Sequence, residues 1–136
     1  MGSRILIVED EFLVAMELEE IVSAAGHEVI GIAPDRASAS ALASEAGGRP
    51  EIAFVDLNLR DGPTGTQIAQ ELAQHARSAI VFVTANPQQI GDPPPGAIGY
   101  VQKPYSPDAI LAAIDVSRRD EPARLPRGLY LFNAAA

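Results

Sequence analysis

The sequence predicts an α/β fold in which helices cover both faces of a doubly wound, five-stranded parallel sheet. Five short apolar runs alternate along the chain with longer segments whose apolar residues recur at helical spacing. This alternation is typical of parallel strands that are buried between two layers of helices. With 136 residues, of which 47% are hydrophobic and 5% aromatic, the chain can form one domain with a core of Ile, Val, Leu and Ala.

The strands are expected in the apolar runs at 5–8, 28–33, 52–55, 80–83 and 98–101. A helix is expected between the first two runs, because five apolar residues share one helical face there: Val14, Leu18, Ile21, Val22 and Ala25. Gly26 can adopt the left-handed conformation that ends this helix. Short helical crossovers of this kind join neighbouring parallel strands.

Three further helical segments follow. Asp35 can cap a helix over 36–45. A third helix is expected over 66–75, and a last one over 107–119, where Ser106 provides the cap and Pro107 the first helical position.

The segment between the fourth and fifth runs differs from the other crossovers. Pro87 and the proline run at 93–95 leave only residues 88–92 free for a helix, which is enough for a single turn. The sequence therefore predicts a shortened fourth helix.

The chain divides into a domain over 4–119 and a tail over 120–136. Residues 120–127 have the mixed charge and prolines of a linker, and an apolar patch follows at 129–132. We expect 128–132 to be extended and to pack on this domain or on a second copy of the chain, since these side chains avoid water. The alternative is a disordered tail.

Charge and composition exclude several classes of function. A net charge of −8 argues against binding to nucleic-acid phosphates or anionic lipid. The absence of Cys excludes disulfides, thiolate metal sites and cysteine nucleophiles. No apolar run approaches the length of a spanning helix, and the start lacks a signal peptide, so a cytoplasmic location is expected.

Polar residues follow the strands at the edge where doubly wound folds bind ligands. Glu9, Asp10 and Glu11 follow the first strand, and Asp56 follows the third. Thr84 ends the fourth strand and Lys103 follows the fifth. Converging carboxylates repel one another unless a divalent cation binds between them, and hard oxygen ligands favour Mg²⁺. A hydroxyl and a lysine beside them suit a phosphoryl group, with Asp56 as the candidate acceptor.

These features resemble the receiver domain of response regulators in two-component signalling. The resemblance spans about 4–119 and depends on five separated motifs in the same order: Glu9-Asp10, Asp56, Thr84, Tyr100 and Lys103-Pro104. Within that family, residues 10–19 and 26–33 are similar to receivers of general-stress regulators that carry a sigma-like domain. No such domain is expected in this sequence, which is interpreted as a stand-alone receiver.

The resemblance implies a flavodoxin-like strand order, 2-1-3-4-5, and a role for each matching residue. Glu9, Asp10, Asp56 and the backbone carbonyl of Asn58 would bind Mg²⁺. Asp56 would accept a phosphoryl group from a sensor histidine kinase or phosphotransfer protein, with Thr84 and Lys103 assisting, and Thr84 and Tyr100 would act as switch residues. The resemblance further implies that the chain catalyses at most its own phosphorylation and dephosphorylation. Its output would pass through another protein, or the chain would act as a phosphate sink. A homodimer is left open.

Two other functions use similar residues. A haloacid-dehalogenase-like phosphatase also combines an aspartyl phosphate with Mg²⁺, Thr and Lys, but it needs a second aspartate where this chain has Asn58, and its nucleophile follows the first strand. A constitutive interaction scaffold would be expected to have lost an acidic or lysine position. The chain has kept all of them.

Overall fold

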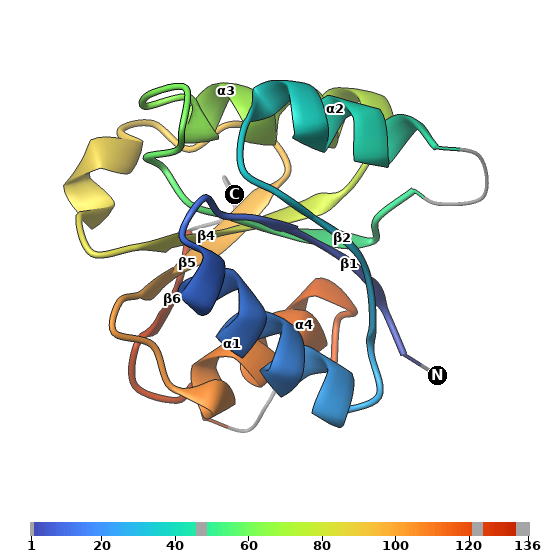
Figure 1. Ribbon diagram of the computed structural model, residues 1–136. Helices are drawn as coiled ribbons and strands as arrows, with labels where there is room; N and C mark the ends of the chain where they lie inside the picture. Colours follow the sequence, from blue (N-terminus) through green and yellow to red (C-terminus); the bar gives the residue numbers. More distant parts are fainter. Residues whose placement is uncertain (1, 46–48, 121–123, 133–136) are drawn as a thin grey trace.

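The computed structural model describes residues 2–45, 49–120 and 124–132, which form three layers with the sheet in the middle (Figure 1). The sheet contains six strands in the order β2-β1-β3-β4-β5-β6. Their bounds are β1 Arg4–Val8, β2 Glu28–Ala33, β3 Ile52–Val55, β4 Ala79–Thr84, β5 Ala97–Gln102 and β6 Leu129–Leu131. The first five strands are parallel, and β6 is antiparallel to β5.

Helices cover both faces of the sheet, as predicted. One face carries α1 (Phe12–Ala24) and α4 (Pro107–Ser117), and the other carries α2 (Arg36–Ser44) and α3 (Gly65–Glu71), as Figure 1 shows. Each face has its own apolar core. Phe54 is buried on the α1 and α4 side, and Phe82 is buried on the α2 and α3 side.

The helix boundaries follow from the predicted capping residues. The Asp35 carboxylate accepts a hydrogen bond of 2.9 Å from the backbone N–H of Ser38 at the start of α2. Ser106 accepts one of 3.2 Å from the N–H of Ala109 at the start of α4. After α1, Gly26 has a φ of +93°, which matches the predicted left-handed stop.

The third helix lies where it was expected, but its second half is wider than an α-helix. Leu72–Ala76 (η1) is a π-helical turn, and Arg77 ends it with a φ of 54°. The wide turn packs closely on Gly96, where an added Cβ would lie 2.6 Å from the Cβ of Ala73. This close packing depends on tertiary contacts, so the local sequence does not predict it.

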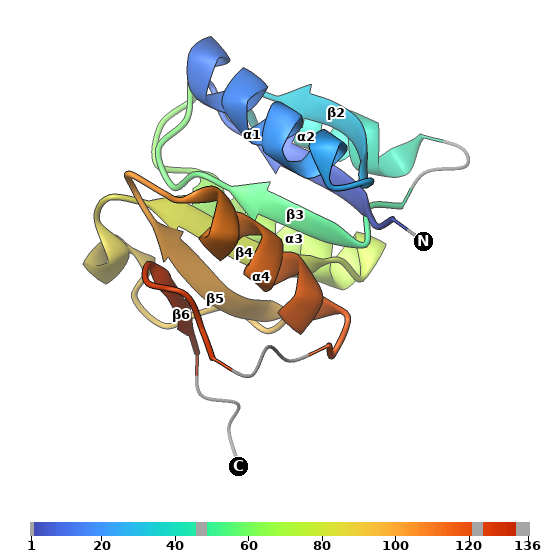
Figure 2. The ribbon, with the colours of Figure 1, turned by 90° about the horizontal axis from the view of Figure 1, so that it is seen from below.

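The predicted shortening of the fourth crossover is confirmed. Pro87–Ile90 (η2) forms a 3-10 helix, and Ile90 is buried against the sheet. The predicted five parallel strands are confirmed, and part of the tail adds a sixth, antiparallel strand, β6, to the sheet (Figure 2). The predicted order 2-1-3-4-5 is confirmed for the first five strands, and β6 extends it beside β5.

Within the described residues, no helix combines the length and apolar character needed to cross a bilayer.

Candidate functional site

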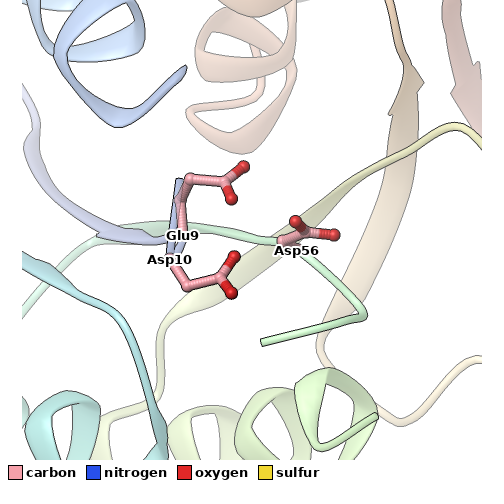
Figure 3. Close-up of side chains that lie close together, drawn as sticks. All are labelled: Glu9, Asp10 and Asp56. Atoms are coloured by element: carbon pink, nitrogen blue, oxygen red, sulfur yellow. The ribbon is translucent and has the colours of Figure 1, made fainter. Parts of the chain in front are cut away.

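Three carboxylates meet at the carboxyl-terminal edge of the sheet. Glu9 and Asp10 follow β1, Asp56 follows β3, and one carboxylate oxygen of each lies within 4.8 Å of the others. Figure 3 shows the carboxyl groups of Glu9 and Asp10 extending towards the side on which Asp56 lies. Glu9 is 4% exposed and Asp56 8% exposed, whereas Asp10 is open to solvent. The parallel register of β1 with β3 accounts for this meeting, because it pairs Val8 with Val55 just before the two acidic segments.

Lys103 bridges two of these carboxylates. Its Nζ lies 3.0 Å from Glu9 Oε1 and 3.2 Å from Asp56 Oδ2. Burial alone would lower the pKa of Lys103, but hydrogen bonds and charge from Glu9 and Asp56 raise it above its ordinary value on balance. The lysine is therefore a fixed positive charge beside the Asp56 oxygen.

The carboxyl group of Glu9 is strongly perturbed by its surroundings. Burial raises the pKa of Glu9 to about 7, and the negative charge of Asp56 adds to the effect. Hydrogen bonds from the backbone N–H of Glu11 and from Lys103 oppose this rise without cancelling it. The ionised form of Glu9 is therefore poorly stabilised in the folded chain. A further cation at the cluster would stabilise it.

The raised pKa of Glu9 predicts how stability depends on pH in the presence of a chelator. Between about pH 4.5 and about pH 7 the unfolded chain has lost the Glu9 proton while the folded chain retains it, so the native state loses stability as pH rises. Relative to Glu9→Gln, which cannot ionise, the wild type should lose about 1 to 3 kcal/mol of unfolding free energy across this window. Urea denaturation at a series of pH values measures the difference.

The matched control is Glu20→Gln, because Glu20 is an exposed glutamate on α1. This variant should follow the wild-type pH profile. A Glu9→Gln profile that runs parallel to the wild type would show that Glu9 titrates as it does in the unfolded chain.

Thr84 ends β4 and is 2% exposed. Its hydroxyl oxygen accepts a hydrogen bond of 2.9 Å from the backbone N–H of Asn86, which ties it to the loop before η2. The backbone carbonyl of Thr84 accepts a bond of 2.9 Å from the N–H of Lys103. Thr84 is therefore linked both to the loop and to the lysine of the cluster.

The other predicted site residues have different surroundings. The backbone N–H of Asn58 donates to Asp56 Oδ1 over 3.3 Å, and this bond holds Asn58 beside the Asp56 carboxylate in the loop after β3. Tyr100 lies on β5 and stacks on the ring of Tyr130, with a centroid distance of 5.0 Å and an interplanar angle of 20°. Tyr100 is thus engaged at the outer part of the sheet rather than with the carboxylate cluster.

A residue that the sequence did not indicate also contacts the site. Asn58 and Gln89 form a reciprocal amide pair, with N–O distances of 3.2 and 2.8 Å. The pair connects the loop after β3 to η2. Since Gln89 has no motif around it and η2 is a single short turn, only the folded chain shows this contact.

Comparisons with known proteins agree with the fold. The family model described as "Response regulator receiver domain" matches residues 5–115. The phyllosphere-induced regulator PhyR of Methylorubrum extorquens is 38% identical over 116 residues, which cover 84% of this chain and 43% of that protein.

Two solved structures resemble the chain in fold. The receiver (REC) domain of PhyR from Erythrobacter litoralis has a TM-score of 0.77 and 26% identity, and the match covers 92% of this chain and 96% of that one. The anti-anti-sigma factor PhyR from Bartonella quintana has a TM-score of 0.70 and 29% identity, over 87% of this chain and 47% of that one. The chain thus spans less than half the length of PhyR itself. From the family match over 5–115 and the receiver-like fold, the chain belongs to the response-regulator receiver family.

Proposed function

We propose that this chain is the phosphoacceptor of a two-component phosphorelay and that Asp56 carries the phosphoryl group. One observation carries the proposal. The Asp56 carboxylate lies within hydrogen-bond distance of the Lys103 ammonium and beside two further carboxylates, at the edge of the sheet where the fold binds ligands.

The transfer would proceed from a phosphohistidine of a sensor kinase or phosphotransfer protein. An oxygen of Asp56 forms a bond to phosphorus while the phosphorus–nitrogen bond breaks, and the histidine nitrogen keeps that electron pair and takes up a proton. Lys103 would neutralise charge on the phosphoryl oxygens, since its Nζ already contacts Asp56 Oδ2. The Thr84 hydroxyl would leave the Asn86 N–H and bind another phosphoryl oxygen.

The donor set fits Mg²⁺, because hard carboxylate oxygens and one side open to water are what this ion prefers. Glu9, Asp10, Asp56 and the carbonyl of Asn58 would bind it. When bound, Mg²⁺ would offset the charge of the carboxylates and of the incoming phosphoryl group. Bound Mg²⁺ would also stabilise the ionised form of Glu9, which burial disfavours.

An exposed apolar patch beside the cluster suits a protein donor. Phe12, Leu13 and Met16, at the start of α1, are 73%, 80% and 41% exposed. Large apolar side chains that are this exposed mark contact sites, and the patch begins two residues after Asp10. We propose that the phosphohistidine protein docks here and that the phosphorylated chain signals through protein contacts.

Phosphotransfer measurements test this function. Histidine kinases of the source organism, each first phosphorylated with ATP, should transfer the label to this chain in the presence of Mg²⁺ and not after chelation. Leu13→Ser should slow the transfer by about tenfold, because the apolar contact is lost, and should leave phosphorylation by acetyl phosphate unchanged.

Leu125→Ser is the matched control, since Leu125 is also an exposed leucine, at 40%, but belongs to the segment after α4. It should transfer at the wild-type rate. Equal rates for the two variants would contradict the docking patch, and label retained by every kinase would contradict the phosphoacceptor function.

A further inference from the structure

The segment after Pro126 occupies the outer edge of β5. Tyr130 and Leu129 pair with Tyr100 and Val101 in antiparallel register, and Figure 2 shows β6 beside β5 at the border of the sheet. Two backbone bonds flank the pairing: Gln102 N–H donates to the Gly128 carbonyl over 2.9 Å, and Phe132 N–H donates to the Ile98 carbonyl over 3.0 Å. The segment is thus a complete, though short, strand.

The edge of β5 is shaped to receive this strand. A Cβ added at Gly99 would lie 2.3 Å from the carbonyl oxygen of Tyr130, so only glycine allows the two backbones to approach this closely. Leu129 is 4% exposed and belongs to the core on the α4 side of the sheet. The burial of Leu129 and the absence of a side chain at Gly99 therefore fix the register of the strand.

The strand also contacts an aromatic side chain that is linked to the candidate site. Tyr100 stacks on Tyr130, and its ring centroid lies 6.0 Å from that of Phe132. Tyr100 and Phe132 pack against the core cluster that contains Phe82 of β4 and Ile90 of η2. The loop before η2 is tied to the Thr84 hydroxyl through the Asn86 N–H. A continuous set of contacts thus connects Thr84 with the tail.

We propose that residues 128–132 are a built-in strand ligand of β5 and that occupation of this edge opposes phosphorylation of Asp56. The inference rests on the proposed function. If the Thr84 hydroxyl leaves Asn86 for a phosphoryl oxygen, the loop and η2 must rearrange against the cluster that holds Tyr100 and Phe132. Any rearrangement that unstacks Tyr100 from Tyr130 weakens the strand, and by linkage the docked strand weakens phosphoryl binding to the same degree.

The strand is suited to reversible release. Only three residues form β6, and Tyr130 and Leu131 remain 44% and 38% exposed. Leu129 is the one residue of β6 that is buried. Release of the strand would remove one buried side chain, Leu129, from the core on the α4 side and leave the other members of that core in place.

Hydrogen exchange of the full chain, with and without beryllofluoride and Mg²⁺ as a phosphoryl mimic, tests the proposal. Fluorine NMR reports whether the mimic is bound. We expect the Gln102 and Phe132 amides to lose protection by about tenfold when it binds. Bound mimic with unchanged protection of both amides would overturn the strand ligand and leave the proposed function intact. An absence of bound mimic would contradict the proposed function, and the inference with it.

Two variants test the reverse direction. Tyr130→Ala removes the stacked ring and should bind beryllofluoride about three- to tenfold more tightly than wild type, whereas Tyr130→Phe keeps the ring and should match wild type. Gly99→Ala should expel the strand by the clash with the Tyr130 carbonyl, and it should bind the mimic more tightly as well. Equal affinity of Tyr130→Ala and Tyr130→Phe would overturn the proposal.

Discussion

Replacement of Asp56 with Asn should abolish incorporation of a phosphoryl group from acetyl phosphate. The amide has nearly the shape of the carboxylate but lacks the nucleophilic oxygen, and it also removes the negative charge that faces Lys103. Intact mass spectrometry should show one added phosphoryl group on the wild type in Mg²⁺, none on Asp56→Asn, and none on the wild type after chelation.

Glu20→Gln is the control for loss of one carboxylate, because Glu20 is exposed on α1 and lies outside the cluster. It should be phosphorylated like the wild type. Phosphorylation of Asp56→Asn to the wild-type level would assign the acceptor role to another residue.

Gly65→Ala should have a large effect on stability. Gly65 is the first residue of α3 and is buried, and an added Cβ would lie 2.2 Å from the carbonyl oxygen of Asp56 and 2.6 Å from the Cα of Leu57. Both neighbours are backbone atoms, so the loop after β3 must move to make room. We expect a loss of about 1 to 3 kcal/mol in unfolding free energy, even after the better helix propensity of Ala is included.

Urea denaturation measures this loss. Because movement of the loop also displaces Asp56, the variant should be phosphorylated more slowly than wild type. Gln67→Ala is the control, because Gln67 is an exposed residue of the same helix. That variant should stay within about 0.5 kcal/mol of wild type. Unchanged stability of Gly65→Ala would mean that the loop after β3 adapts without cost.

The sequence predicts most of the fold because its determinants are local. The apolar run at 52–55 and the cap at Asp35 specify a strand and a helix start without reference to the rest of the chain. The prolines at 87 and 93–95 likewise limit the fourth crossover to the short turn of η2. Since parallel strands place their carboxyl ends at one edge, the strand ends also predict that Glu9 and Asp56 meet.

What the sequence does not predict depends on contacts between distant segments. The apolar patch at 129–132 indicates a packed tail, but its place in the sheet depends on the missing side chain of Gly99 and the ring of Tyr100. The Asn58–Gln89 amide pair joins two loops that are 31 residues apart. Neither residue type nor spacing distinguishes such a pair from two solvated amides.

The central claim, that Asp56 carries the phosphoryl group, is tested most directly by chemical mapping of the modified residue. After reaction with acetyl phosphate and Mg²⁺, borohydride reduces an aspartyl phosphate to homoserine, which peptide mass spectrometry can locate. We predict homoserine at position 56 and unmodified Glu9 and Asp10. Reduction at either of these two carboxylates, or a borohydride-resistant phosphate on Thr84, would contradict the account.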